Sequence, residues 1–341
     1  MHCRIAIVLL SILLPAAAMP SLAAAEDIDP VAVIDAAFAD LPPDGLVHPE
    51  IVKAQVLFER AGVSPGEIDG KYDAILFDEM IAGFAEMQGL PADIKWSPEL
   101  WTKLSGASSG PVLTEYVITK EDAKGPFFPD LPDRMEAMQN FKSAGYRTLR
   151  ELLAEKFHMS EQLLGALNPE KPLQAGEKII VANVLAAAKP AQAARLDVDV
   201  RRQTVKAYSA RDQLIGFFKA SVGSEDKPSP SGSLTVVSIV SEPSWHYNPK
   251  YQFKEIETNK PFDINSGPNN PLGLTWIALS KPSYGIHGTS EPSKVGKEAS
   301  HGCVRLTNWD AERLSEMLTK GVTVNFLDAN RRDLDPAFAV L

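Results

Sequence analysis

The spacing of apolar residues divides the chain into a helical first part and a second part with the alternation of β-strands. Between residues 51 and 104, apolar side chains recur at intervals of three or four positions, as in amphipathic helices. From Leu196 onward they alternate with polar residues, and β-branched side chains are frequent between Gly and Pro turns. The pattern predicts a multidomain α+β protein. Its last domain, residues 195–328, is expected to be predominantly β with one helix at 309–318.

The segment 45–105 predicts a small helical N-terminal domain. Turns are expected at Pro65-Gly66 and at 89–91, and they separate three helical stretches. The segments 54–57, 66–72 and 84–90 resemble the type 1 peptidoglycan-binding domain. That resemblance implies a role in binding the cell-wall polymer, and a helical spacer is the alternative.

A second small unit is expected at 140–185. Thr148 and Glu151 have the spacing of a capping box before an amphipathic helix, and Ser160 can cap a second short helix. A strand is expected at 178–181. This β-α-α-β order, with the segment 153–183, resembles a LysM module, a fold that binds sugar chains and also serves as a spacer. His158 is expected to be structural, because no other histidine or cysteine lies near it in the sequence.

Residues 1–25 have the features of a signal peptide. Arg4 precedes the apolar run 5–14, and three alanines before Glu26 are typical of a cleavage site. The run is shorter than the roughly 20 residues that a membrane-spanning helix needs, although a retained anchor is the alternative. No later segment is apolar enough to span a membrane. We therefore expect export to the periplasm, with no transmembrane segment in the mature chain.

Charge and cysteine content narrow the functional classes. The 341 residues carry a net charge of -10 and lack the basic stripe that is typical of nucleic-acid-binding proteins, so no nucleic acid partner is expected. Of two cysteines, Cys3 lies in the predicted signal peptide, which leaves Cys303 alone in an oxidising compartment. Such a cysteine is either a buried structural thiol or a reactive thiol.

The surroundings of Cys303 favour the reactive thiol. His287 precedes it by sixteen positions, and the segment 300–302 is Ser-His-Gly. A thiolate attacks acyl carbons, and a nearby imidazole can accept the thiol proton. Arg305 offers a guanidinium suited to a carboxylate. Three alternatives remain open: zinc bound by His287, His301 and Cys303, a structural turn, and an intact but inactive site.

The segments 287–289 and 300–305, with Gly296 between them, resemble the signature of the L,D-transpeptidase catalytic (YkuD) domain family. The turns at 223–232 and 270–273 fit the same family, with Ser229 in place of the usual threonine. The resemblance covers roughly residues 196–327.

This resemblance implies a role for each matching residue. Cys303 is the nucleophile and His287 the general base, with the carbonyl of Gly288 orienting the imidazole. His301 is expected to support the loop and shape the charge near the thiol, with the role of base as the alternative. The backbone N–H groups of Gly302 and Cys303 are expected to form an oxyanion hole.

Substrate binding is expected from Arg305, Tyr284 and Ser300. A structural salt bridge is the alternative for Arg305, and Tyr284 is the candidate for a wall of the cleft. Trp276, a strand aromatic, is expected in the core rather than in the cleft. Neither a metal nor another cofactor is expected.

The implied reaction is an acyl transfer on peptidoglycan stem peptides. Cys303 attacks the diamino acid carbonyl of a tetrapeptide, releases D-alanine and passes the acyl group from a thioester to an amine. The acceptor is another stem, which gives a 3-3 cross-link, a lysine of an envelope protein, or a D-amino acid. A carbapenem is expected to acylate the same thiol. The alternatives are an L,D-carboxypeptidase or endopeptidase, and a catalytically inactive wall-binding protein.

Overall fold

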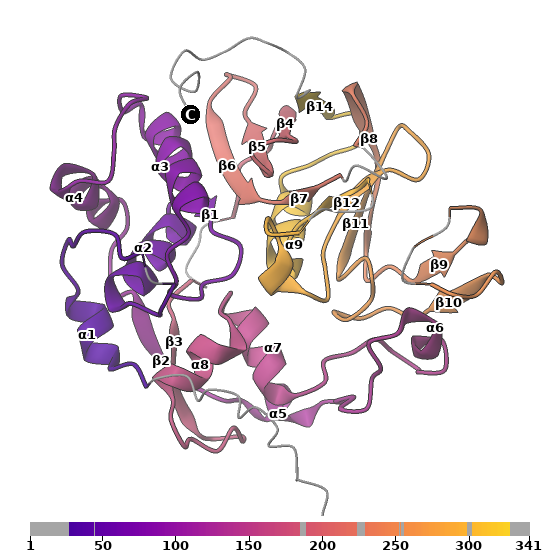
Figure 1. Cartoon of the computed structure of the whole chain (residues 1–341), viewed down its shortest axis with the longest axis horizontal. Helices are drawn as coiled ribbons and strands as arrows, with labels where there is room; N and C mark the ends of the chain where they lie inside the picture. Colours follow the sequence, from indigo (N-terminus) through magenta and orange to yellow (C-terminus); the bar gives the residue numbers. More distant parts are fainter. Residues whose placement is uncertain are drawn as a thin grey trace, which may run out of the picture.

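The computed structural model describes residues 27–43, 45–184, 189–223, 229–251, 253, 256–298 and 302–327 (Figure 1). The predicted signal peptide, Ser300 and His301 lie outside the described residues. Within the described part, no helix is both long and apolar enough to cross a membrane.

Short helices build the first part of the chain. They are α1 (Pro30–Asp35), α2 (Pro49–Arg60), α3 (Ala74–Gln88) and α4 (Pro98–Gly106), with the short strand β1 (Val63–Ser64) after α2. Asp73 and Ser97 cap α3 and α4 with their side chains, and α3 ends at Gly89, whose φ is 62°. Helices α2, α3 and α4 lie in the segment for which the sequence predicts a helical domain.

A unit of two strands with four short helices between them follows. It contains β2 (Leu113–Val117), α5 (Lys120–Lys124), α6 (Met135–Met138), α7 (Leu149–Lys156), α8 (Glu161–Leu167) and β3 (Lys178–Ala182). Strands β2 and β3 pair antiparallel. Thr148 and Ser160 accept hydrogen bonds from the backbone at the starts of α7 and α8. The first strand lies before residue 140, the boundary expected from the sequence, because a long connection separates it from α7.

These first two units share one hydrophobic core. Phe58 and Phe77 from the helical segment belong to the same buried cluster as Leu153 and Phe157 from the unit between β2 and β3. Phe217 of the C-terminal domain also belongs to this cluster. Residues predicted as separate modules therefore pack together, since neither segment alone has enough apolar surface to form a large core.

The C-terminal domain is built on a large mixed sheet, as the sequence predicts. Its elements are β4 (Arg195–Asp199), β5 (Thr204–Tyr208), β6 (Leu214–Lys219), β7 (Ser221–Val222), β8 (Gly232–Ser241), β9 (Trp245–Tyr247), β10 (Phe262–Ile264), β11 (Thr275–Leu279), β12 (Gly285–His287), β13 (Val304–Arg305), α9 (Asn308–Glu316) and β14 (Thr323–Leu327). Among the described residues, the sheet order is β1-β6-β5-β4-β14-β8-β11-β12-β13-β7, and β9 pairs only with β10. Helix α9 ends two residues earlier than the sequence predicts.

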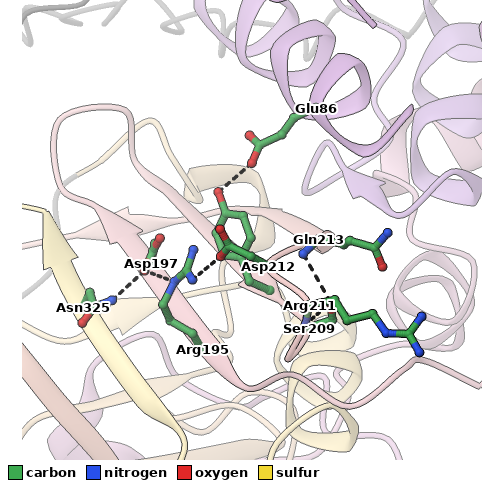
Figure 2. Close-up of polar contacts among 9 residues, drawn as sticks. Glu86, Arg195, Asp197, Ser209, Arg211, Asp212, Gln213 and Asn325 are labelled. Carbon is green, nitrogen blue, oxygen red and sulfur yellow. Dashed lines mark hydrogen bonds and ion pairs between the residues drawn. The ribbon is translucent and has the colours of Figure 1, made fainter. Parts of the chain in front are cut away.

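The N-terminal part contacts the C-terminal domain through β1, α3 and α7, among other elements. Strand β1 pairs parallel with β6 and so extends the sheet. Glu86 of α3 contacts β5, where it accepts a hydrogen bond from Tyr208 Oη at 2.8 Å; Figure 2 shows Glu86 beside the cluster of Arg195, Asp197 and Asp212. Helix α7 packs against α9, which itself lies on β11 and β12 (Figure 1).

Candidate active site

Neighbouring strands β11, β12 and β13 bring the predicted catalytic residues to one face of the sheet. His287 is paired with Trp276 of β11 on one side and with Arg305 of β13 on the other. Paired residues in a sheet point to the same face, and side chains alternate along each strand. The alternation is visible in β13 and the residue before it: Val304 is fully buried, while Cys303 and Arg305 are partly exposed. Cys303 therefore projects to the same face as His287.

The His287 side chain is buried and held in one orientation. Its Nδ1 lies 2.6 Å from the carbonyl oxygen of Gly288, so Nδ1 carries the proton in this contact and Nε2 keeps its lone pair. Burial, and then the charge of Arg305, lowers the pKa of His287 to about 3, although the Gly288 carbonyl acts in the opposite direction. The imidazole is neutral at neutral pH and can accept a proton at Nε2.

Cys303 lies directly before β13 and is partly exposed. Gly302 before it has a φ of 97°, a conformation that glycine adopts at little cost. The Cys303 Sγ lies 3.6 Å from the carbonyl oxygen of Ser283, in the turn between β11 and β12. Tyr284 follows in that turn, and the Nζ of Lys281 lies 4.4 Å from the centre of its ring. The thiol and Tyr284 thus share one edge of the site.

Arg305 lies beside His287 and faces Ser221 of β7 across the strand pair. Its Nε is buried and has no hydrogen-bond partner in the described part of the chain. A buried donor without a partner costs free energy, on the order of 1–3 kcal/mol. An anionic group bound at this face would supply the missing acceptor.

Trp276 lies on the site face, and its expected place in the core is wrong. Its ring centre is 5.8 Å from that of His287, and a Cβ built on Gly285 would lie 2.4 Å from the indole. The neighbouring Ile277 is the residue that enters the core. Side chains alternate between the two faces of β11, so only one of two neighbouring residues can enter the core. The sequence of a short strand does not reveal which of the two it is.

Asn308, which the sequence analysis missed, holds the loop that carries Gly288. Its Oδ1 accepts hydrogen bonds from the N–H of Thr289 at 3.1 Å and of Leu274 at 3.2 Å. Its Nδ2 donates to Glu155 of α7 at 3.0 Å and to the carbonyl of Pro268 at 3.2 Å. No local motif marks such a residue, because its partners come from distant parts of the chain.

Two predicted site residues, Ser300 and His301, lie outside the described residues, and the zinc alternative depends on His301. Among the residues that the structure does describe, no group of three His, Cys, Asp or Glu side chains is placed to hold a metal ion.

Comparisons with known proteins point to one family. Residues 193–325 match the model of the L,D-transpeptidase catalytic domain (YkuD). A YkuD protein of Bacillus licheniformis, placed by its name among the L,D-transpeptidases, is 28% identical over 179 residues, which is 51% of this chain and 91% of the relative. YqjB of Bacillus subtilis, with a name of the same kind, is 33% identical over 125 residues, 35% of this chain and 64% of the relative.

A similar solved structure is that of L,D-transpeptidase 3 from Mycobacterium tuberculosis in complex with a faropenem-derived adduct. Its TM-score is 0.34 and its identity 17%, over 46% of this chain and 72% of that one. The family match and the two relatives carry the assignment. Residues 193–325 of this chain are an L,D-transpeptidase catalytic domain, the domain of a cysteine acyltransferase.

Proposed function

We propose that this chain transfers acyl groups between peptidoglycan stem peptides, with Cys303 as nucleophile and His287 as general base. One observation carries the proposal: a buried, neutral imidazole whose Nδ1 is engaged by the Gly288 carbonyl, on the sheet face to which Cys303 projects. A neutral imidazole with its Nδ1 engaged presents the Nε2 lone pair as the acceptor for the thiol proton.

In the first half-reaction, Sγ of Cys303 attacks the diamino acid carbonyl of a tetrapeptide stem while the thiol proton passes to Nε2 of His287. The carbonyl becomes an oxyanion, for which the N–H groups of Gly302 and Cys303 are the proposed donors. Collapse of this intermediate breaks the peptide bond, D-alanine leaves with the proton from Nε2, and a thioester remains.

In the second half-reaction, a neutral amine attacks the thioester and gives its proton to His287. The amide forms, the C–S bond breaks, and the proton returns to the thiol. Another stem as acceptor gives a 3-3 cross-link; a lysine of an envelope protein is the other proposed acceptor. Arg305 is the proposed partner for a substrate carboxylate, since its Nε lacks an acceptor. Tyr284 and Ser300 are proposed to contact the stem.

The rest of the chain fits a cell-wall enzyme. Residues 1–25 are proposed as a signal peptide and the periplasm as the compartment. The segments 45–105 and 140–185 are proposed as peptidoglycan-binding and LysM-like units that contact glycan strands. Cross-linking there would contribute to cell-wall biogenesis and cell shape. A carbapenem is proposed to acylate Cys303.

The test is mass spectrometry of the products after the purified chain is incubated with disaccharide-tetrapeptide. Wild-type protein should give dimers that have lost one D-alanine, and Cys303→Ala should give none. His287→Gln should lose activity, whereas His246→Gln is the matched control, because His246 is exposed and paired with Asp263 away from the site.

Each other result has a defined meaning. Tripeptide without dimers would identify water as the acceptor and make the chain an L,D-carboxypeptidase. Activity that survives in Cys303→Ala would exclude the proposed nucleophile. If the wild type neither reacts with the stem nor forms a carbapenem adduct, the enzymatic proposal fails and a wall-binding role replaces it.

A further inference from the structure

We propose that Asn308 and Glu155 are positioning residues for His287. Glu155, from helix α7 before the catalytic domain, fixes the Asn308 amide, and this amide fixes the Gly288–Thr289 peptide that orients the imidazole. The proposal rests on the proposed role of His287 as base, and it assigns part of the catalytic scaffold to a unit outside the family match.

Asn308 and His287 form hydrogen bonds with the same peptide group, that between Gly288 and Thr289. The carbonyl of Gly288 and the N–H of Thr289 belong to the same planar peptide. The carbonyl accepts from His287 Nδ1 at 2.6 Å, and the N–H donates to Asn308 Oδ1 at 3.1 Å. Rotation of this peptide would break both hydrogen bonds together, and hydrogen bonds in series polarise one another. Asn308 therefore acts on the imidazole without touching it.

Asn308 is itself held in place by its position in α9 and by its hydrogen bonds. It is the first residue of α9, after the cap Thr307, and it is 1% exposed. Its Oδ1 accepts twice and its Nδ2 donates to Glu155 and Pro268. Because every direction of the amide is occupied, the side chain has one orientation in which oxygen faces Thr289.

Asn308 lies very close to two glycines. A Cβ built on Gly288 would lie 2.3 Å from Asn308 Oδ1, and one built on Gly273 would lie 2.0 Å from the same oxygen. Asn308 can approach the loop this closely only because both positions are glycine. The glycine of the His-Gly-Thr segment thus makes room for the positioning residue as well as supplying the carbonyl.

Glu155 is 8% exposed and lies between Asn308 and Tyr146. Burial raises the pKa of Glu155 to about 8, and Glu151 and Glu312 act in the same direction. A neutral side chain at pH 7 is closely matched by glutamine, which retains an acceptor for Asn308 Nδ2. Glu155→Gln is therefore the conservative variant and Glu155→Ala the disruptive one.

The experiment measures the His287 tautomer and the acylation rate in the same full-length proteins. Long-range ¹H–¹⁵N correlation spectra report which ring nitrogen carries the proton, with His287→Gln for assignment. Stopped-flow kinetics with meropenem report acylation of Cys303. Asn308→Ala and Glu155→Ala should lose the uniform Nδ1–H tautomer and acylate about 10- to 100-fold more slowly, the usual range for outer-shell partners. Glu155→Gln should restore both readouts to near wild type.

The matched control is Ser64→Ala. It removes a buried hydrogen bond of 2.8 Å to Asp310, in the same turn of α9 as Asn308, and contacts neither His287 nor its loop. A merely structural role for the α7–α9 contact predicts that this control slows acylation as much as Asn308→Ala does.

Folded Asn308→Ala with the wild-type tautomer and an acylation rate within about twofold would overturn the proposal. If Asn308→Ala does not fold, the comparison of Glu155→Ala with Glu155→Gln decides: equal behaviour of the two overturns it. If wild-type protein does not acylate at all, the proposed function fails, and the tautomer spectra still decide the positioning role.

Discussion

Among the carboxylates of the N-terminal part that contact the catalytic domain, Glu86 and Glu155 have opposite surroundings. Glu86 of α3 is exposed and accepts hydrogen bonds from Lys206 at 2.7 Å and Tyr208 at 2.8 Å, both on β5. Figure 2 shows Glu86 at the end of a dashed line from this strand. Glu155 of α7 is buried and binds Asn308 behind the loop of His287. Water can replace the partners of Glu86, whereas Asn308, the partner of Glu155, is 1% exposed.

The difference in burial indicates that the N-terminal part is coupled to the catalytic domain more strongly at α7–α9 than at α3–β5. An exposed ion pair contributes about 0–1 kcal/mol, because solvent screens it and two side chains lose freedom. A buried polar network contributes little net stability when complete but is costly when one member is removed. We therefore expect changes at α7–α9 to affect both stability and chemistry, and changes at α3–β5 to affect neither strongly.

The largest effect is expected from Asn308→Leu. The substitution leaves the N–H groups of Thr289 and Leu274 without their acceptor, and it removes the donor to Glu155 and to the Pro268 carbonyl. We expect a loss of about 3–5 kcal/mol in the free energy of unfolding, as for other disrupted buried networks. Urea denaturation followed by circular dichroism measures it. A loss below about 1 kcal/mol would mean that water reaches this contact.

The second-largest effect is expected from Gly288→Ala. The new methyl group would collide with Asn308 Oδ1, and overpacking of this kind costs about 1–3 kcal/mol. Acylation by a carbapenem should also slow, because the peptide that orients His287 must move. Gly106→Ala is the matched control: it ends α4, and nothing lies within 4 Å of its added Cβ. Equal losses in the two variants would contradict the steric argument.

A pH-dependent effect is expected from Glu155→Gln. The pKa of Glu155 is about 8 in the folded state, above the ordinary value of 4.5, so between these values the folded state binds more protons than the unfolded state. Glu155 therefore makes wild-type stability fall as pH rises from about 4.5 to about 8, and glutamine removes this dependence. Melting temperatures from pH 5 to pH 9 should shift in favour of the variant. Parallel curves would show that Glu155 does not titrate in this window.

The smallest effect is expected from Glu86→Gln. It weakens the pair with Lys206, and we expect a change of about 1 kcal/mol or less in the free energy of unfolding. Acylation of Cys303 should remain at the wild-type rate. A large drop in that rate would show that the α3–β5 contact also reaches the active site and would remove the contrast with Glu155.

Much of the architecture was predictable, and the failures share a cause. Helical spacing and caps predicted α7 and α8, and alternation predicted the β-rich domain, since both depend on neighbours within a few residues. The expected core position of Trp276 was wrong, because a five-residue strand does not show which face is covered. The shared core of the first two units was also missed, since packing between segments leaves no local signal.

The sequence by itself determined which chemistry to predict: a cysteine, a histidine sixteen positions before it and the glycines around them are local features of residues 287–305. Only the tertiary structure decided what holds that histidine in place. Glu155 and Asn308 are 153 positions apart, and no sequence motif contains both or predicts their contact. They meet because α7 and α9 pack together, and such packing depends on the shape and burial of whole elements rather than on any short pattern.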